Sequence, residues 1–434
     1  MARRARHAPL DVFLNNRLVG RLRQETSGAI DFTYAPGWLA WAPAIPVSIS
    51  LPLREERYIG APVMAVFDNL LPDNDGIRRT LAARVRADGI DAFSLLGAIG
   101  RDCIGALQFL PSDMHPGPAG VVDGVRLDNA QVGALLGDLA RAPLGLTEDA
   151  SFRISLAGAQ EKTALLFRDG GWWAPTGTTP TTHILKPQIG PANGVDLSHS
   201  VENEYLCMKL TKAIGLPVAD VEIADFDGRR ALVVERFDRR WAQDGRLLRL
   251  PQEDMCQALS IPPAIKYEAH GGPGIEKILR LLSGSDDPAA DQTTFLKANI
   301  WFWLLGATDG HAKNFSVALG LGGRYRLTPL YDILSVQPLV DAGQVRRNQY
   351  KLSMAVGDNR HYGVGLIMPR HFVQTARRAG IGERTVEAIL EELSERIPAA
   401  FEAVEAELPA DLPAGLSASI FGGVGSRLQI VRRR

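Results

Sequence analysis

Apolar and polar residues alternate along residues 10–19, on both sides of an Asn-Asn pair. Because side chains in a strand point alternately to opposite faces, this alternation predicts two strands joined by a hairpin turn. Residues 62–110 follow a mostly helical pattern, with Pro72 and Asp73 as a helix-start signal. Residues 111–124 are rich in Gly and Pro, which is typical of a linker.

A second region of strand-like pattern begins at about residue 152. Residues 152–175 predict a strand, a glycine-containing turn, a second strand and then a hairpin at Asp169-Gly170-Gly171. The apolar run 182–187 predicts another short strand that ends at its proline. Residues 218–238 return to the strand pattern around an Asp-Gly turn.

Helices account for most of the remaining pattern. Residues 200–217 predict an amphipathic helix with Ser200 as its N-cap and an end at Gly215. After about residue 245 the pattern is helix-rich, most clearly over 295–305 and 369–408. A small β-rich lobe followed by a larger helical lobe is the bilobal α+β layout of protein kinases, although a layout alone is only an analogy.

We therefore expect four segments along the chain. They are an N-terminal α/β subdomain (1–112), a linker with a connecting helix (113–150), a small lobe (151–242) and a helical lobe (243–434). A length of 434 residues is consistent with more than one domain.

Composition narrows the class of protein further. A hydrophobic share of 46%, a charged share of 22% and a net charge of −1 describe a globular chain with no global attraction to nucleic acid. No apolar run reaches the roughly 18 residues of a membrane span, and no apolar segment follows the basic N-terminus. The three cysteines are far apart, which argues against a disulfide framework or a zinc site. We expect a cytoplasmic protein without a membrane partner.

The stretch "GATDGHAKNF", residues 306–315, places polar residues directly after the apolar segment 300–305. Asp309 and Asn314 have the D-x-x-x-x-N spacing that pairs a catalytic carboxylate with a metal-binding amide in kinase loops. Lys313 is placed to steady a transferring phosphate, and His311 to brace the loop. By itself the pattern is equally consistent with a capped turn.

Two further residues fit phosphoryl transfer. Asp332 ends the apolar segment "LTPLYDIL", as a second ligand for Mg²⁺ at a strand end requires. Lys186 ends the strand "THILK", where a lysine has to reach solvent or an anion such as a phosphate. In kinases a helix glutamate positions such a lysine, and we favour Glu204 over Glu202 for this ion pair. A turn residue and a solvated helix glutamate remain the alternatives.

A candidate phosphate loop lies at "SLAGAQEKTA", residues 155–164. Its small residues allow backbone amides to approach a phosphate closely. Glu161 stands where a Walker loop requires glycine before the lysine, so a P-loop NTPase is not indicated. "VVERFD", residues 233–238, ends the small lobe and is a candidate hinge for an adenine. A plain hairpin turn and an ordinary strand end are the respective alternatives.

The sequences of these segments resemble those of the HipA serine/threonine kinases, the toxins of bacterial HipBA toxin–antitoxin modules. The resemblance rests on "FRISLAGAQEKTALL", "ALVVERFDRRW", "KYEAHGGPGI", "GATDGHAKNFSV" and "YRLTPLYDILS", with "VFDNLLPDN" nearer the N-terminus, and spans about residues 10–405. It implies a kinase that uses ATP and Mg²⁺. It implies Asp309 as the catalytic residue and Asn314 and Asp332 as Mg²⁺ ligands.

The same resemblance implies the remaining roles. ATP would contact Lys186, His311 and Asn314. It would also contact a phosphate loop, made up of Ala157, Gly158, Ala159, Gln160, Glu161 and Lys162, and a hinge, made up of Glu235, Arg236 and Phe237. Ser155 would be the site of autophosphorylation. Because a phosphoserine adds roughly −1.5 to −2 charges, its formation next to ATP would act as an off-switch.

The resemblance also implies partners. These are a dimeric helix-turn-helix antitoxin of the HipB type, operator DNA bound through that complex, and glutamyl-tRNA synthetase as protein substrate, whose phosphorylation causes growth arrest and persistence. Arg377 and Arg378 are the candidate DNA contacts, although Gly380 stands where another basic residue is expected. Two other functions remain open: a lipid or small-molecule kinase of the phosphoinositide-kinase type, and a co-repressor without enzymatic activity.

Overall fold

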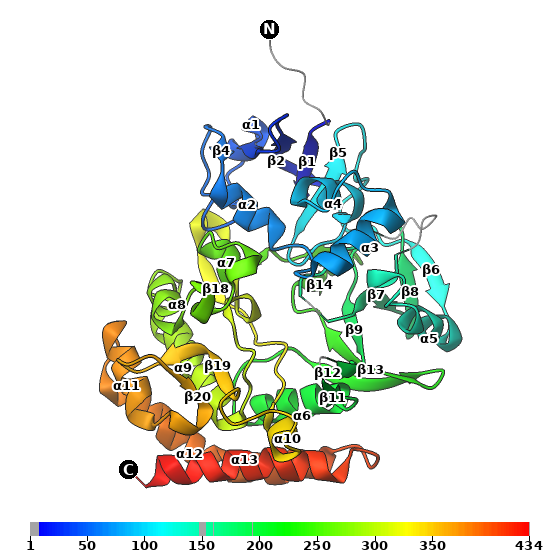
Figure 1. The fold of residues 1–434 in the computed structure, drawn as a ribbon. Helices are drawn as coiled ribbons and strands as arrows, with labels where there is room; N and C mark the ends of the chain where they lie inside the picture. The colour runs from blue at the N-terminus through cyan, green and yellow to red at the C-terminus, as the bar shows by residue number, and fades with distance from the viewer. Residues whose placement is uncertain (1–7, 147–152, 159, 193, 434) are drawn as a thin grey trace. The chain divides into compact units, whose positions relative to one another are not determined.

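The computed structural model describes residues 8–146, 153–158, 160–192 and 194–433, and Figure 1 shows their helices and strands in chain order. These residues group into two units. Unit 1 comprises Met1–Pro187, Ala224–Ala264 and Val317–Tyr325, and unit 2 comprises Gln188–Ile223, Ile265–Ser316 and Arg326–Arg434. The segment predicted as a small lobe, 151–242, is therefore divided between the two units.

Unit 1 begins with a five-stranded sheet in the order β4-β3-β2-β1-β5. Its strands are β1 (Leu10–Leu14), β2 (Arg17–Gln24), β3 (Ile30–Tyr34), β4 (Tyr58–Ile59) and β5 (Leu107–Pro111). The predicted hairpin between β1 and β2 is confirmed, and Asn15 and Asn16 both adopt the left-handed conformation that tight hairpin turns require.

Four helices accompany this sheet: α1 (Pro36–Leu39), α2 (Ala61–Asp68), α3 (Asp75–Val85) and α4 (Ala92–Ile99). They pack on it through one hydrophobic core that includes Phe32, Phe67 and Phe109 and extends to Ile154 and Leu156 at the start of the candidate phosphate loop. The predicted helical region thus holds three separate helices and ends in strand β5. Its core is continuous with residues that precede the loop.

A six-stranded sheet forms the other part of unit 1, in the order β12-β13-β9-β7-β8-β6. Its strands are β6 (Gly124–Leu127), β7 (Thr163–Arg168), β8 (Gly171–Pro175), β9 (His183–Pro187), β12 (Val221–Phe226) and β13 (Arg229–Glu235). The predicted turns after β7 and β12 are confirmed. The strand predicted before the glycine-containing turn is wrong, because residues 153–157 form no strand and Gly158 makes only an isolated bridge with Pro72.

Short elements complete this unit. Helix α5 (Asn129–Gly137) packs on the six-stranded sheet through Val132 and Leu136. The others are η1 (Pro143–Gly145), β14 (Arg239–Trp241), β15 (Leu247–Arg249), α7 (Met255–Ala258), η2 (Pro263–Ile265) and η5 (Leu321–Gly323), with a three-stranded sheet of β16 (Gln252–Asp254), β17 (Ser316–Leu319) and β18 (Tyr325–Leu327).

Unit 2 is mainly helical, and its centre is α9 (Pro288–Leu305), which buries both Trp301 and Trp303 completely. Its further helices are α6 (Ser200–Ala213), α8 (Ile275–Leu282), α10 (Gln337–Asp341), α11 (Pro369–Arg378), α12 (Glu383–Glu407) and α13 (Ala414–Arg432), which is red in Figure 1. Its short elements are β10 (Gly190–Ala192), β11 (Val195–Leu197), β19 (Lys351–Val356), β20 (His361–Gly363), η3 (Glu268–His270), η4 (Ala312–Asn314) and η6 (Val364–Leu366).

Two details of α6 correct the sequence prediction. His199, and not Ser200, occupies the N-cap position, and it makes no side-chain capping bond. The Ser200 hydroxyl instead accepts a hydrogen bond from the amide of Ile189 at 2.9 Å. No helix within the described residues combines the length and the apolar character that a membrane span requires.

Candidate active site

The predicted catalytic loop begins where α9 ends. Gly306 adopts a left-handed conformation with φ of 72°, and its amide donates to carbonyl oxygens of the last turn. A Cβ atom at this position would lie 1.8 Å from the hydroxyl oxygen of Tyr350, so only glycine fits. The buried helix therefore ends sharply, and the polar residues start on a rigid support.

Asp309 and Asn314 come together in this loop as their spacing predicts. The backbone carbonyl of Asp309 accepts hydrogen bonds from the amide of His311 and from the side-chain Nδ2 of Asn314, both at 2.8 Å. The Asp309 carboxylate remains 66% exposed, whereas Asn314 is buried. The loop thus presents an accessible carboxylate next to an amide group in a fixed orientation.

His311 and Lys313 are buried beside them. The Nε2 atom of His311 lies 3.9 Å from the Asp309 carboxylate, and its side chain is 4% exposed. Tyr331 donates a hydrogen bond to the Lys313 carbonyl at 2.9 Å, which ties the loop to the segment before Asp332. The position of His311 fits the bracing role expected for it.

Asp332 has a backbone φ of 59°, in the left-handed region that few side chains other than Asn and Asp adopt. It was expected at the end of a strand, but the nearest strand, β18, ends at Leu327. The segment before it is instead anchored by an isolated bridge between Val218 and Leu330. Backbone conformations of this kind often mark functional positions.

The donor atoms present in this loop suit a hard cation. Because the Nδ2 atom of Asn314 donates to Asp309, its Oδ1 is the atom oriented for ligation. Among the described residues, no cluster of three or more His, Cys, Asp or Glu is arranged for metal binding. Mg²⁺ often uses only one or two protein ligands together with substrate phosphates and water, so the two predicted ligands, Asn314 and Asp332, would not need a third.

Tyr267 is a site residue that the sequence analysis did not single out. Its hydroxyl donates to Oδ1 of Asp309 at 2.8 Å, and its ring packs edge-on against His311 with a centroid distance of 4.9 Å. It precedes Asp309 by 42 residues, so no local spacing connects the two. The only sequence signal was its place in the motif "KYEAHGGPGI".

The predicted nucleotide-binding residues other than His311 and Asn314, which belong to unit 2, lie in unit 1. Lys186 on β9 is 6% exposed and pairs in register with Leu232 of β13. On the other side of β9, Leu185 pairs with Thr163, the residue after Lys162 of the candidate phosphate loop. The sheet therefore brings the strand lysine, the loop and the strand that leads to the hinge together.

Three hydrogen bonds hold the phosphate loop against the N-terminal subdomain. The hydroxyl of Ser155 donates to the Leu70 carbonyl at 2.7 Å, and its amide donates to the Asp102 carbonyl at 2.8 Å. The Gly158 carbonyl accepts from the amide of Asp73 at 3.2 Å. Ser155 is fully buried, so its hydroxyl is not accessible to a kinase in this conformation.

The other loop residues differ in their exposure. Ala157, Gly158 and Gln160 are half-buried, Glu161 is exposed, and Lys162 is 9% exposed. The expected contact of Ala159 falls outside the described residues. Gln160 donates to the carbonyl of Pro187, next to Lys186, at 3.4 Å.

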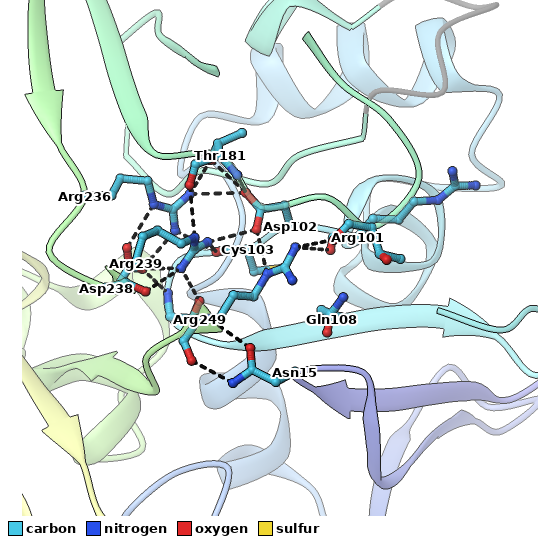
Figure 2. A network of polar contacts seen from close by, with 12 residues as sticks. Asn15, Arg101, Asp102, Cys103, Gln108, Thr181, Arg236, Asp238, Arg239 and Arg249 are labelled. Atoms are coloured by element: carbon cyan, nitrogen blue, oxygen red, sulfur yellow. Dashed lines mark hydrogen bonds and ion pairs between the residues drawn. The ribbon is translucent and has the colours of Figure 1, made fainter. Parts of the chain in front are cut away.

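The candidate hinge, Glu235 to Phe237, carries a side chain that points into a buried ionic network (Figure 2). The Arg236 guanidinium binds the carboxylate of Asp238 at 2.8 Å and that of Asp102 at 3.4 Å. Its backbone amide donates to the Thr182 carbonyl. Any contribution of Arg236 to adenine binding would therefore be indirect, through the position of the backbone.

Asp102 is the centre of this network. It accepts hydrogen bonds from Arg239 at 2.9 Å, from Arg249 at 2.8 Å and from the backbone and side chain of Thr181. Burial alone would raise the pKa of Asp102, but the guanidinium charges outweigh it and hold the pKa far below its usual value. The N-terminal subdomain thus supplies the anion that the arginines around the hinge require.

Four further residues from the sequence analysis lie in unit 2: the two glutamates of α6 and the arginine pair of α11. Glu202 and Glu204 on α6 are buried, and Glu202 accepts a hydrogen bond from Gln188 at 2.6 Å. Since Lys186 belongs to unit 1, its ion pair with Glu204 stays a prediction. Arg377 is 72% exposed and forms one ion pair, with Glu383 at 4.0 Å, whereas Arg378 is 35% exposed and pairs with Glu276 and Asp358.

Comparison with known proteins places this site in a family. A family model described as the HipA-like C-terminal domain matches residues 154–401, and one described as the HipA N-terminal domain matches residues 10–110. The first model alone covers more than half of the chain. The chain belongs to the HipA family.

Individual relatives agree with this assignment. The HipA-family chain is 38% identical over 352 residues to a putative kinase, Y4mE, of Sinorhizobium fredii, with 80% of each chain covered. It is 28% identical over 375 residues to the serine/threonine-protein kinase toxin HipA of Shewanella oneidensis, covering 82% of this chain and 80% of the relative.

A solved structure confirms the kinase-like α+β fold. The Shewanella oneidensis HipA in a complex with HipB and operator DNA superposes with a TM-score of 0.81 at 26% identity, over 98% of both chains. The likeness therefore also reaches into α13, which lies beyond the residues that the two family models match.

Proposed function

We propose that this HipA-family protein is a serine/threonine-protein kinase that transfers the γ-phosphate of ATP to a protein hydroxyl. The observation that carries the proposal is the loop of Asp309 and Asn314, in which an exposed carboxylate lies beside an oriented amide. Asp309 would accept or orient the proton of the acceptor hydroxyl. Bound Mg²⁺ would neutralise charge that develops on the phosphates, and Asn314 and Asp332 would hold it.

The other predicted residues would complete nucleotide binding. Lys186 and the backbone amides of residues 157–162 would contact the phosphates, and Lys313 would steady the transferring group. Glu235 and Phe237 would line the adenine, with Arg236 holding the hinge from behind through Asp102. These roles follow the family resemblance, and the sheet that joins β7, β9 and β13 supports them.

Autophosphorylation of Ser155 would switch the enzyme off. Its hydroxyl now donates to the Leu70 carbonyl from a fully buried position. A phosphate at neutral pH adds negative charge and removes that donor, so the phosphate and the Leu70 carbonyl oxygen would repel each other. The loop would have to leave its place against the N-terminal subdomain, which would remove backbone amides from the ATP phosphates.

The substrate and partners of the toxin are proposed by analogy. A relative forms a complex with HipB and operator DNA, so we expect a helix-turn-helix antitoxin as partner here. Arg377 would be the better candidate for a DNA contact, because it is more exposed and has one distant carboxylate, Glu383 at 4.0 Å, whereas Arg378 is bound by two at 3.1 and 3.2 Å. Glutamyl-tRNA synthetase is the proposed substrate.

The test is incubation with ATP, Mg²⁺ and a panel of aminoacyl-tRNA synthetases, followed by mass spectrometry of every protein. We expect phosphate on Ser155 of the kinase and on a serine or threonine of glutamyl-tRNA synthetase. Phosphate on a different synthetase would change the proposed substrate and leave the proposed kinase activity in place. Label that appears in lipid vesicles and in no protein would overturn the protein-kinase proposal in favour of a phosphoinositide-kinase type.

A further inference from the structure

Tyr267 contacts the proposed catalytic carboxylate from a segment outside the catalytic loop, Ile265 to Gly274. The hydroxyl of Tyr267 donates to Oδ1 of Asp309 at 2.8 Å. The inference drawn from this contact rests on the proposed function, because it assigns Tyr267 a role through Asp309.

Tyr267 is held firmly on its own side of the contact. Its carbonyl accepts hydrogen bonds from the amides of His270 and Gly272, both at 3.0 Å. A Cβ atom at Gly272 would lie 2.2 Å from the carbonyl oxygen of Ile265, so this tight turn requires glycine. The ring of Tyr267 packs against the buried His311.

The residue after Tyr267 anchors the segment further. The carboxylate of Glu268 accepts a hydrogen bond from the amide of Ala355 in β19 at 2.6 Å and pairs with Arg360 at 3.2 Å. The phenol of Tyr267 therefore projects from a fixed backbone.

The orientation of the Asp309 carboxylate matters for the proposed transfer. The backbone carbonyl of Asp309 is fixed by His311 and Asn314, but its side chain is 66% exposed. An exposed carboxylate samples several rotamers, and phosphoryl transfer requires one orientation toward the acceptor hydroxyl. A hydrogen bond to a charged group is among the stronger side-chain contacts.

We propose that Tyr267 is a positioning residue for phosphoryl transfer: its hydroxyl fixes the Asp309 carboxylate so that Oδ2 accepts the hydrogen bond of the acceptor serine or threonine. No bond to Tyr267 forms or breaks during the transfer. The opposite role is a block, in which the phenol occupies the place of the acceptor hydroxyl and has to be displaced before substrate binds. The two roles predict opposite changes in rate.

The test compares wild type with Tyr267→Phe, which keeps the ring on His311 and removes only the hydroxyl. Tyr205→Phe on α6 is the matched control, because it removes a phenol in the same unit with no contact to the loop. The rate of ³²P transfer from ATP to protein is measured at varied ATP, with the chain itself or the identified synthetase as acceptor. Thermal melting fixes a temperature at which all variants are folded.

We expect Tyr267→Phe to lower kcat by roughly ten- to one-hundred-fold, the effect of losing one hydrogen bond to a charged group. KM for ATP should stay within about twofold, and Tyr205→Phe should match wild type. An unchanged kcat, a rise in kcat, or a rise in KM for ATP at unchanged kcat would each overturn the positioning role.

Failure of the proposed function gives a different result. If wild type transfers no phosphate, or if Asp309→Asn transfers as much as wild type, the kinase mechanism itself falls. If Asp309→Asn is inactive while Tyr267→Phe equals wild type, only the role of Tyr267 falls.

Discussion

Glu253 in strand β16 is a carboxylic acid that folding buries almost completely. Its Oε1 accepts a hydrogen bond from the amide of Ile49 at 2.7 Å. Burial is the largest effect and raises the pKa of Glu253 from its ordinary 4.5 to about 8. The folded chain thus keeps this proton over a pH range in which the unfolded chain has lost it.

The consequence is a stability that falls as pH rises. Between about pH 4.5 and pH 8 the folded state binds the extra proton, so Glu253 lowers the free energy of unfolding by up to about 1.4 kcal/mol per pH unit. We expect Glu253→Gln to flatten this dependence, measured by urea unfolding at pH 5.5, 6.5 and 7.5. The exposed Glu56→Gln is the control, and equal slopes for Glu253→Gln and wild type would contradict the assignment.

Single residues also show the limit of sequence reasoning. The spacing of Asp309 and Asn314 marked them as a candidate pair, and within so short a loop the Asn314 side chain reaches the Asp309 backbone carbonyl. Tyr267 reaches the Asp309 carboxylate across 42 residues, and only the tertiary fold makes that contact. Arg236 was assigned to ATP by resemblance, but its side chain serves the network around Asp102.

At the scale of elements, helix α13 completes the support of the catalytic loop. Arg427 of α13 donates through Nε to the Leu304 carbonyl in the last turn of α9 and through Nη1 to Gln337, both at 2.8 Å. The neighbouring Leu305 carbonyl accepts from Ser335 at 2.6 Å. Carbonyls at a helix end need such partners, and a cation there also favours the helix dipole.

We expect Arg427→Met to lower the free energy of unfolding by about 2–3 kcal/mol, because it leaves the buried Leu304 carbonyl without its charged donor. Urea unfolding measures the change, and the rate of phosphoryl transfer should fall with it. Arg432→Met, at the exposed end of the same helix, should remain close to wild type. Equal stability of the two variants would show that α13 does not support α9 in this way.

Most strands and helices were predictable because their patterns are local. The hairpin after β1 follows from Asn-Asn, and the end of α9 follows from Gly306. Helix starts were less predictable, since several polar residues compete for the cap: Asn74, and not Asp73, accepts the amides that begin α3. The segment before the phosphate loop has a strand-like pattern because it is buried, yet it pairs with no strand.

At the scale of the whole molecule, unit 1 depends on charges drawn from distant parts of the sequence. Asp102 follows the N-terminal helices, while Arg236, Arg239 and Arg249 follow the six-stranded sheet, and all four side chains are nearly inaccessible to solvent. Burial lowers the pKa of Arg239 to about 10, so the guanidinium stays charged at neutral pH. The N-terminal subdomain and the six-stranded sheet should therefore unfold together.

We expect Asp102→Asn to lower the free energy of unfolding of this unit by about 3–5 kcal/mol, because it leaves three buried guanidiniums with one carboxylate. Chemical denaturation followed by tryptophan fluorescence measures the loss. Asp244→Asn removes an exposed partner of Arg246 and should leave the transition unchanged. A small change in the free energy of unfolding would mean that the network contributes little to joining the N-terminal subdomain to the six-stranded sheet.

The division of the chain into two units was only partly visible in the sequence. Alternation marked the sheets and the helical period marked the helices, and the family resemblance then implied an α+β kinase-like fold. It could not reveal that helix α6, inserted between strands β9 and β12, belongs by its contacts to the helical unit. Assignment of a segment to a unit depends on which distant residues it packs against, and no local pattern encodes that.

The most direct test of the account is Asp309→Asn, compared with wild type for phosphate transfer from ATP and for growth arrest on expression. The substitution keeps the shape of the side chain and removes its negative charge, and the backbone carbonyl that holds Asn314 stays in place. We predict loss of autophosphorylation and of growth arrest with binding of the antitoxin intact. Retained toxicity and retained phosphate transfer would contradict the kinase mechanism.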